Sequence, residues 1–198
     1  MTRSMCAVVA CVGAVSVASG QVADFEEPGL AATPFTSGGL DFVGDGPNLV
    51  FPAPGIGGAN NGTTTFGWCG SSCTPAAQVI TVTTNSGMMF NMVSIDAGNL
   101  APRGNPLGYV EGMTVELVGY QMGGVTVTDS LLIRENMFTT FALTGFTNLT
   151  RLEIFAPAVG GGNPDPVIDN LVYRPIPAPS SIAVLTLCGV IGARRRRS

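Results

Sequence analysis

Two cysteines lie close together in the segment Trp68-Cys69-Gly70-Ser71-Ser72-Cys73. Three residues separate Cys69 from Cys73, whereas redox motifs of the Cys-x-x-Cys type have two and lie near a βαβ pattern. In an exported protein, two cysteines this close are expected to form a disulfide that closes a tight loop. Free thiols and redox catalysis are the alternatives that the spacing leaves open.

The chain contains no histidine. Catalytic arrangements of Ser/His/Asp or Cys/His are therefore excluded, and a zinc site of the usual kind is nearly so. A pair of carboxylates can still cleave glycosidic bonds, but the spacing of the 13 acidic residues singles out no pair. We expect a protein that is not an enzyme. The alternative is a secreted polysaccharide-active enzyme, a glycosidase or lyase, that uses a carboxylate pair.

Several side chains have the chemistry of a sugar-binding site, in which aromatic rings stack and polar groups form hydrogen bonds. The candidate ligand-binding residues are Trp68, Arg103, Asn105 and Tyr109, and Asp96 and Tyr120 could line the same site. The competing interpretation is that Trp68 and Tyr120 pack in the core.

Short segments of alternating hydrophobicity must position these residues. Residues 79–84 alternate Ile80 and Val82 with threonines, which predicts a half-buried strand. Residues 114–121 and 125–133 flank Met122-Gly123-Gly124, a hairpin signal. In residues 89–97 we expect Phe90 and Met92 on one face and Val93 and Ile95 on the other, and this change of face predicts a β-bulge near Met92. The other predicted strands are 22–26, 40–43, 48–51, 64–68, 89–97, 138–143, 151–155 and 167–174. Many short strands without a helical pattern predict an all-β sandwich.

Residues 21–174 are expected to form this single domain. They contain four arginines, no lysine and all 13 acidic residues, which gives a net charge of −9. A surface this acidic repels phosphate backbones, so nucleic acid is excluded as a partner. Neutral sugars and divalent cations are compatible with it.

The N-terminus has the layout of a secretory signal peptide. Arg3 is followed by an apolar core at residues 5–17 and by the small residues Ala18-Ser19-Gly20. We expect residues 1–20 to be removed by cleavage before Gln21.

The C-terminal residues 175–198 contain a Pro-rich motif, an apolar segment at 182–193 and an arginine cluster at 194–197. A bilayer span needs about 20 apolar residues, so the 12 residues of this short helix suit a transient membrane contact. The arginines would stay on the cytoplasmic side. A C-terminal core helix is the alternative, although the segment has no polar face.

This layout resembles the PEP-CTERM sorting signal of bacteria that make extracellular polysaccharide. The matching residues are Pro177, Ala178 and Pro179, the apolar segment, and Arg194, Arg195, Arg196 and Arg197. The resemblance implies export, a transient anchor in the inner membrane, and processing by an exosortase-like membrane protease. Ala178 stands where the family has its central glutamate.

The domain itself resembles a galactose-binding-like jelly roll, a layout shared by many carbohydrate-binding modules. The resemblance rests on Asp24-Phe25-Glu26, on the mid-chain Val-Glu-Leu-Val-Gly-Tyr segment, and on Ile168-Asp169-Asn170-Leu171-Val172-Tyr173. It implies that the first and last strands pair and that acidic residues from both ends hold a structural Ca²⁺. Glu26, Glu27 and Asp169 are the candidate ligands, and solvated carboxylates are the alternative.

These observations together predict an exported, non-enzymatic protein of the cell envelope, cell surface or extracellular matrix. Polysaccharide is the partner that best fits its charge and candidate residues, and no cofactor is expected other than the structural Ca²⁺.

Overall fold

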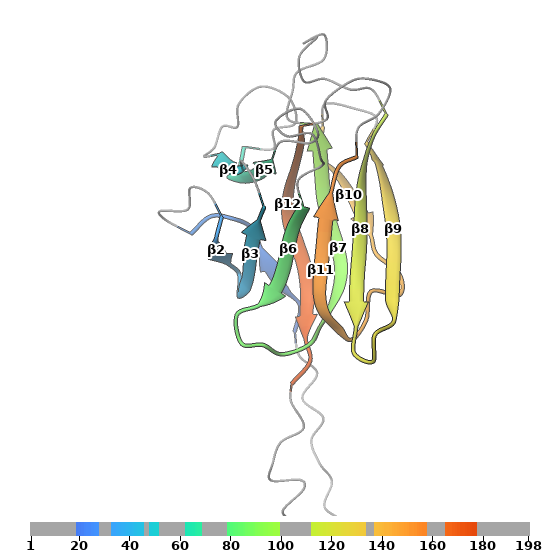
Figure 1. Ribbon diagram of the computed structural model, residues 1–198. Coiled ribbons are helices and arrows are strands. Elements are labelled where there is room, and N and C mark those ends of the chain that lie inside the picture. Colours follow the sequence, from blue (N-terminus) through green and yellow to red (C-terminus); the bar gives the residue numbers. More distant parts are fainter. Residues whose placement is uncertain are drawn as a thin grey trace, which may run out of the picture.

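The computed structural model describes residues 19–27, 33–45, 48–51, 62–68, 79–99, 112–133, 137–157 and 165–177 (Figure 1). The signal helix and the C-terminal hydrophobic helix predicted from the sequence lie outside these residues. Across the described ranges we find no helix with the length and apolarity that a membrane crossing requires.

Twelve strands make up the described part of the chain. They are β1 (Gln21–Ala23), β2 (Phe35–Ser37), β3 (Leu40–Gly44), β4 (Asn48–Phe51), β5 (Thr65–Trp68), β6 (Val79–Thr84), β7 (Phe90–Asn99), β8 (Met113–Gln121), β9 (Thr126–Ile133), β10 (Thr139–Ala142), β11 (Leu149–Phe155) and β12 (Pro166–Pro175). The sequence pattern predicts all of these except β2, which is three residues long and too short to show an alternation.

The strands form two layers that face each other (Figure 1). One layer has the order β2-β3-β6-β11-β8-β9. The other has the order β10-β7-β12-β5-β4, with β1 also paired to β12. A single pair, Leu149 of β11 opposite Phe90 of β7, joins the layers into one sheet. The predicted all-β jelly-roll sandwich is therefore confirmed, as is the pairing of the first strand with the last.

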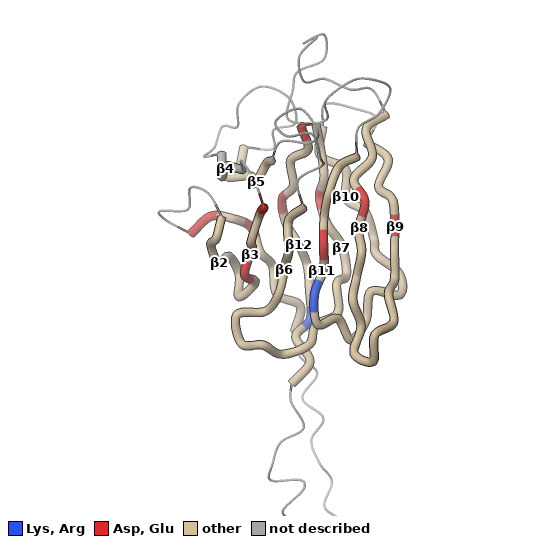
Figure 2. The backbone as a smooth tube through the Cα atoms, in the orientation of Figure 1, with Lys and Arg blue, Asp and Glu red and all other residues tan. Residues whose placement is uncertain are grey.

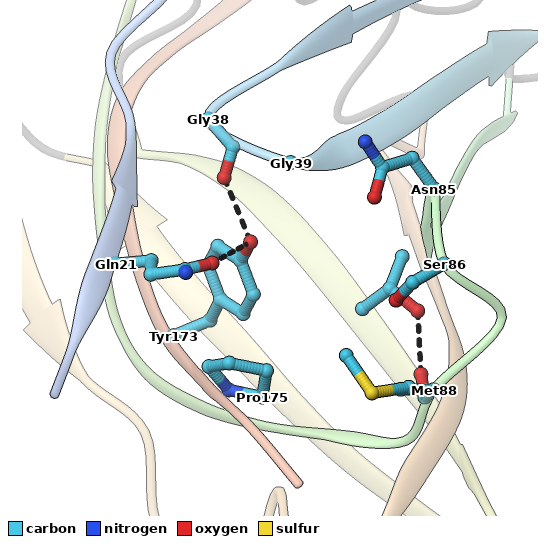
Figure 3. A pocket seen from close by; sticks show the side chains of 9 residues that line it. Gln21, Gly38, Gly39, Asn85, Ser86, Met88, Tyr173 and Pro175 are labelled. Atoms are coloured by element: carbon cyan, nitrogen blue, oxygen red, sulfur yellow. Dashed lines mark hydrogen bonds between the residues drawn. The ribbon is translucent and has the colours of Figure 1, made fainter. Parts of the chain in front are cut away.

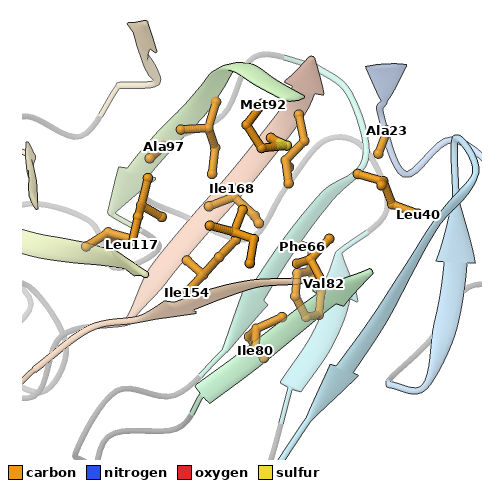
Figure 4. Close-up of a cluster of buried hydrophobic side chains, with 14 of the residues drawn as sticks. Ala23, Leu40, Phe66, Ile80, Val82, Met92, Ala97, Leu117, Ile154 and Ile168 are labelled. Atoms are coloured by element: carbon orange, nitrogen blue, oxygen red, sulfur yellow. The ribbon is translucent and has the colours of Figure 1, made fainter. Parts of the chain in front are cut away.

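The core lies between the layers and follows from the two-residue period of the strands. In β6, Ile80 and Val82 are buried, whereas Val79, Thr81 and Thr83 are half-buried on the outer side. Figure 4 shows these two side chains meeting residues from several other strands, including Phe66 and Ile154. Burial of apolar area on this scale is the main term that stabilises the fold.

The predicted bulge in β7 is present. Val172 of β12 is opposite Ser94 and Tyr173 is opposite Met92, so Val93 is an extra residue on β7. The bulge turns Ile95 to the same interior as Met92, which a regular strand would not allow. The expectation that Ile95 lies on the face opposite Met92 is therefore wrong.

Phe25 has a left-handed backbone, with φ of +58°, although it is not a glycine. This conformation costs roughly 1–2 kcal/mol. Complete burial of the ring, whose centroid is 5.2 Å from that of Phe42, offsets the cost. The Phe25 N–H also donates to the Ser37 hydroxyl at 3.0 Å. The turn places Phe25 inside and leaves Glu26 and Glu27 to reach other segments.

Tyr173 ties the last strand to the first part of the chain (Figure 3). Its hydroxyl lies 2.7 Å from the Gly38 carbonyl oxygen and 2.5 Å from the Gln21 side-chain amide. A phenol has one proton, so the two acceptors, the Gly38 carbonyl oxygen and Gln21 Oε1, share a single donor. Gly38 has φ of +53°, and a Cβ there would lie 2.0 Å from the Val22 carbonyl oxygen. The β2–β3 turn therefore packs directly on β1.

Burial raises the pKa of Tyr173. Its stabilising contribution is then complete below the ordinary tyrosine pKa of 10.0 and is lost as the pH rises above it, because only the unfolded chain ionises freely. We expect the free energy of unfolding to fall above pH 10 more steeply in the native protein than in Tyr173→Phe. At neutral pH the variant should lose about 1 kcal/mol. Chemical denaturation at pH 7 to 11 measures both effects, and identical alkaline slopes would contradict the assignment.

Candidate functional site

The outward face of the β2-β3-β6-β11-β8-β9 layer is a broad surface rich in hydroxyl groups; we call it the outer face. One cross-strand row on it runs through Val43, Thr81, Glu153, Val118 and Thr128. All five are exposed or half-buried, and in β6 and β11 the residues on either side of Thr81 and Glu153 are buried.

Tyr120, Arg151 and Glu153 form a cluster on the neighbouring strands β8 and β11 of the outer face. The Arg151 guanidinium carbon lies 3.8 Å from the centroid of the Tyr120 ring, a cation–π contact. The Tyr120 hydroxyl donates to Glu153 Oε2 at 2.8 Å, and Arg151 Nη2 lies 3.2 Å from Glu153 Oε1. The three side chains therefore hold one another in a fixed arrangement.

The cluster remains accessible to a ligand, since the Arg151 and Glu153 side chains are 42% and 23% exposed. It offers guanidinium donors, a carboxylate acceptor and an aromatic ring. Among the described residues the arginines are Arg151 and Arg174, whereas acidic residues occur on many strands (Figure 2). Among the described residues of the outer face, Arg151 is thus the positive group, and the other charged side chains are acidic.

The predicted calcium ligands Glu26 and Asp169 reach adjacent residues of the chain. Glu26 accepts hydrogen bonds from the Thr64 N–H at 2.6 Å and from the Thr64 hydroxyl at 3.2 Å. Asp169 is completely buried and accepts from the Thr63 hydroxyl at 2.7 Å. The segment before β5 therefore connects the two carboxylates.

Glu27 reaches a different place, the β2–β3 turn, where it accepts from the Gly38 N–H at 2.6 Å. Burial would raise its pKa, but hydrogen bonds from the Ser37 hydroxyl and the Gly38 N–H outweigh burial and lower the pKa. In the described part of the chain, no group of three or more acidic, cysteine or histidine side chains is placed to hold a metal ion. The three carboxylates thus do not form the expected cluster, because Glu27 turns away.

Asp169 also faces Asp96 directly across the β12–β7 pair. Like charges at opposed positions repel, and Asn170 separates them. Its side-chain nitrogen lies 3.0 Å from Asp96 Oδ2 and 3.1 Å from Asp169 Oδ2. Asn170 reaches both because its backbone is left-handed, with φ of +43°, at an irregularity in β12. Asp96 additionally accepts from the Thr140 hydroxyl of β10 at 2.5 Å.

The structure corrects the assignment of Trp68 as a ligand-binding residue. Trp68 is 2% exposed and its ring lies 5.8 Å from that of Phe66, so the indole is part of the core. Tyr120, by contrast, is half-buried on the outer face. The other candidate ligand-binding residues, Arg103, Asn105 and Tyr109, lie outside the described residues.

Further predicted residues also lie outside the described ranges. They are the cysteines Cys69 and Cys73 and the sorting-signal residues Ala178, Pro179, Arg194, Arg195, Arg196 and Arg197. Pro177, at the end of the last described range, is exposed. The disulfide and the sorting signal stay predictions.

Arg151 and Glu153 are not among the site residues predicted from the sequence. The alternation of residues 151–155 does indicate that they face outward, because Leu152 and Ile154 are predicted to point inward. What the local pattern could not show is that β8 lies beside β11 and brings Tyr120 opposite Arg151.

No family model and no curated protein matches the chain. Among solved structures, an exo-β-agarase matches over 82% of this chain and 26% of its own, with 10% sequence identity and a TM-score of 0.52. The arabinose-bound MgGH51 α-L-arabinofuranosidase matches over 80% of this chain and 27% of its own, with 10% identity and a TM-score of 0.53. This chain therefore spans about a quarter of each of those chains, and the likeness shows a shared fold.

At a lower TM-score of 0.42, the family 32 carbohydrate-binding module from C. perfringens NanJ, in complex with galactose, also matches. It has 16% identity, and the match covers 73% of this chain and 98% of the module.

Glu27 is expected to stabilise the fold above its ordinary pKa of 4.5 and to lose that effect as the pH falls through its lowered folded-state pKa. Glu27→Gln should therefore cost about 1 kcal/mol at pH 7, since the carboxylate is partly exposed, and should flatten the loss of stability in acid. Urea denaturation at pH 3 to 7 is the measurement. This role is refuted if the free energy of unfolding falls as steeply with decreasing pH in the variant as in the native protein.

Calcium binding stays a prediction, now restricted to Glu26 and Asp169. If both bind one ion, millimolar Ca²⁺ should raise the melting temperature of the native protein by mass action, and a chelator should reverse the rise. Glu27→Gln should keep this response, whereas Asp169→Asn should lose it. If neither calcium nor chelator changes the melting temperature of the native protein, a calcium site at Glu26 and Asp169 is ruled out.

Proposed function

We propose that the protein is a non-catalytic carbohydrate-binding protein and that the outer face binds a polysaccharide chain. The observation that carries the proposal is the cluster of Tyr120, Arg151 and Glu153, which places a ring, donors and an acceptor together on an accessible sheet. A sugar ring has an apolar face and a rim of hydroxyl groups, and such a surface complements both.

The shared fold supports this choice of ligand. The agarase and the arabinofuranosidase are carbohydrate-active by description, and this chain corresponds to about a quarter of each. We carry over the class of ligand and not the catalytic activity of the whole enzymes. Threonine and serine hydroxyls on the outer face, such as Thr81, Thr128 and Ser130, add further hydrogen-bonding groups.

A neutral polysaccharide is the preferred ligand. The domain expected at residues 21–174 carries a net charge of −9, which disfavours an anionic polymer over most of the surface. Arg151 is already paired with Glu153 and stacked on Tyr120, so it serves best as a donor to sugar hydroxyls.

The carboxylate-pair alternative has one observation in its favour. Asp96 and Asp169 both contact the Asn170 side-chain nitrogen, so their oxygens lie no more than about 6 Å apart. Glycosidase carboxylates are roughly 5–9.5 Å apart. Asp169 is completely buried and its oxygens are engaged by Thr63 and Asn170, however, which leaves it unable to reach a substrate. Binding without catalysis is the better account.

The proposal includes export to the cell envelope, surface or extracellular matrix. The signal-peptide layout at residues 1–20 and the tripartite tail at 175–198 support it, with an exosortase-like membrane protease as the processing partner. Mass spectrometry of the exported protein should find that residues 182–198 are missing, and an intact tail would overturn this part of the proposal.

A glycan array of neutral polysaccharides, followed by affinity electrophoresis on those retained, tests the binding surface. Tyr120→Ala or Arg151→Ala should weaken binding by about ten-fold, because the loss of a central aromatic or arginine anchor costs more than about 1 kcal/mol. Tyr120→Phe, which keeps the ring, should bind more tightly than Tyr120→Ala. Thr139→Ala on β10, in the other layer, is the matched control.

Two results would contradict the proposal. One is the absence of binding to any polysaccharide on the array by the folded native protein. The other is binding that Tyr120→Ala and Arg151→Ala leave as strong as the Thr139→Ala control.

A further inference from the structure

A separate pocket lies at the end of the sandwich where β1 begins and β12 ends (Figure 3). Its cavity volume is about 350 Å³, within the roughly 300–1,000 Å³ of small-ligand sites. Tyr173 and Pro175 of β12 form one side together with Gln21. The β6–β7 turn at residues 84–88 forms the facing side, and the turn Gly38–Gly39 crosses between them.

Gly39 keeps part of this space open. A Cβ at this position would lie 2.7 Å from the Tyr173 hydroxyl oxygen and 3.6 Å from Gln21 Oε1, so a side chain would press on the pocket wall. The φ of +85° at Gly39 also disfavours any other residue. At Gly39, the turn therefore lines the pocket with backbone atoms alone.

Hydrogen bonds hold the wall in place on each side. The Asn85 N–H donates to the Gly39 carbonyl at 3.1 Å, which connects the two turns. The Thr84 hydroxyl donates to the Met88 carbonyl at 2.5 Å, and the Ile176 N–H donates to the Met89 carbonyl at 2.8 Å. A site preorganised in this way loses little entropy when a ligand binds.

The chemistry of the lining restricts the ligand. None of the lining residues carries a charge at neutral pH: the single ionisable one is Tyr173, whose ordinary pKa is 10.0 and is raised further by burial. The hydroxyls of Tyr173 and Thr84 are already bonded within the protein, whereas Asn85 and Ser86 are exposed turn residues. Met88 and Pro175 add apolar surface.

This composition matches a small neutral molecule with both hydroxyl groups and an apolar face. A cation would meet no carboxylate in the lining, and an anion would be repelled by the acidic protein as a whole. We infer that the pocket binds one neutral sugar ring, either a free monosaccharide or the end of a chain. The choice of a sugar rests on the proposed function, but the pocket is distinct from the outer face and makes no use of Tyr120.

A titration of the full-length, ¹⁵N-labelled protein with galactose and with arabinose, monitored by NMR, tests this inference. The backbone signals of Gly39 and the side-chain amide signals of Asn85 should shift with a dissociation constant of about 1 mM, which corresponds to a binding free energy of roughly 4 kcal/mol. Ser86→Trp should fill the pocket and abolish the shifts, and Asn85→Ala should weaken binding about five-fold. Thr144→Ala, in another exposed turn, is the matched control and should bind normally.

A second titration uses oligosaccharides of the same two sugars. Shifts with the monosaccharide indicate a free-ring site, shifts with the oligosaccharide alone indicate a chain-end site, and both support the inference. Folded protein without shifts at Gly39 and Asn85 in either titration overturns it, as does binding that Ser86→Trp leaves intact. If a polysaccharide shifts the signals of Tyr120 but not those of Gly39 and Asn85, the inference about the pocket is refuted and the proposed function stands. If the signals of Gly39 and Asn85 shift but Tyr120→Ala leaves polysaccharide binding unchanged, the proposal for the outer face is refuted instead.

Discussion

The position of β12 between β7 on one edge and β1 with β5 on the other determines the rest of the structure. These contacts join residues from the beginning, middle and end of the domain. Strand pairs of such large sequence separation form only after long loops have closed, which costs chain entropy before the contact contributes. The domain is therefore complete only when its last strand is in place. Both the Tyr173 pocket and the buried Asp169 lie on that strand.

The turn at Phe25 links the core to the polar contacts of the N-terminal segment. Three consecutive residues have opposite requirements here: the Phe25 ring packs in the aromatic cluster, whereas the carboxylates of Glu26 and Glu27 lie outside it. A regular strand would direct Phe25 and Glu27 to the same face. The left-handed φ at Phe25 breaks this alternation, so that the ring is buried, Glu26 reaches Thr64 and Glu27 reaches Gly38. The burial of the Phe25 ring and the charge-assisted hydrogen bonds of Glu26 and Glu27 thereby offset the free-energy cost of the left-handed backbone.

Uncharged polar neighbours contact several carboxylates of the described residues. The described residues contain two arginines, Arg151 and Arg174, and many more carboxylates. Hydroxyl, amide and backbone donors contact Asp96, Asp169 and Glu27. On the outer face, Arg151 pairs with Glu153. This ion pair, stacked on the Tyr120 ring, is what makes the cluster a candidate binding surface.

The sequence by itself determined the strands, the β8–β9 hairpin and the need for a bulge near Met92, because these depend on the two-residue period and on glycine at local turns. It also indicated that Asp169 and Glu26 come from the chain ends that meet in a jelly roll. Only the tertiary structure decided that Trp68 is buried, that Tyr120 faces Arg151, and that Glu27 turns away from Asp169. Those outcomes depend on which strands lie side by side and on a left-handed backbone at Phe25. Neither is encoded in a short stretch of residues, since both follow from how distant segments compete to fill one core.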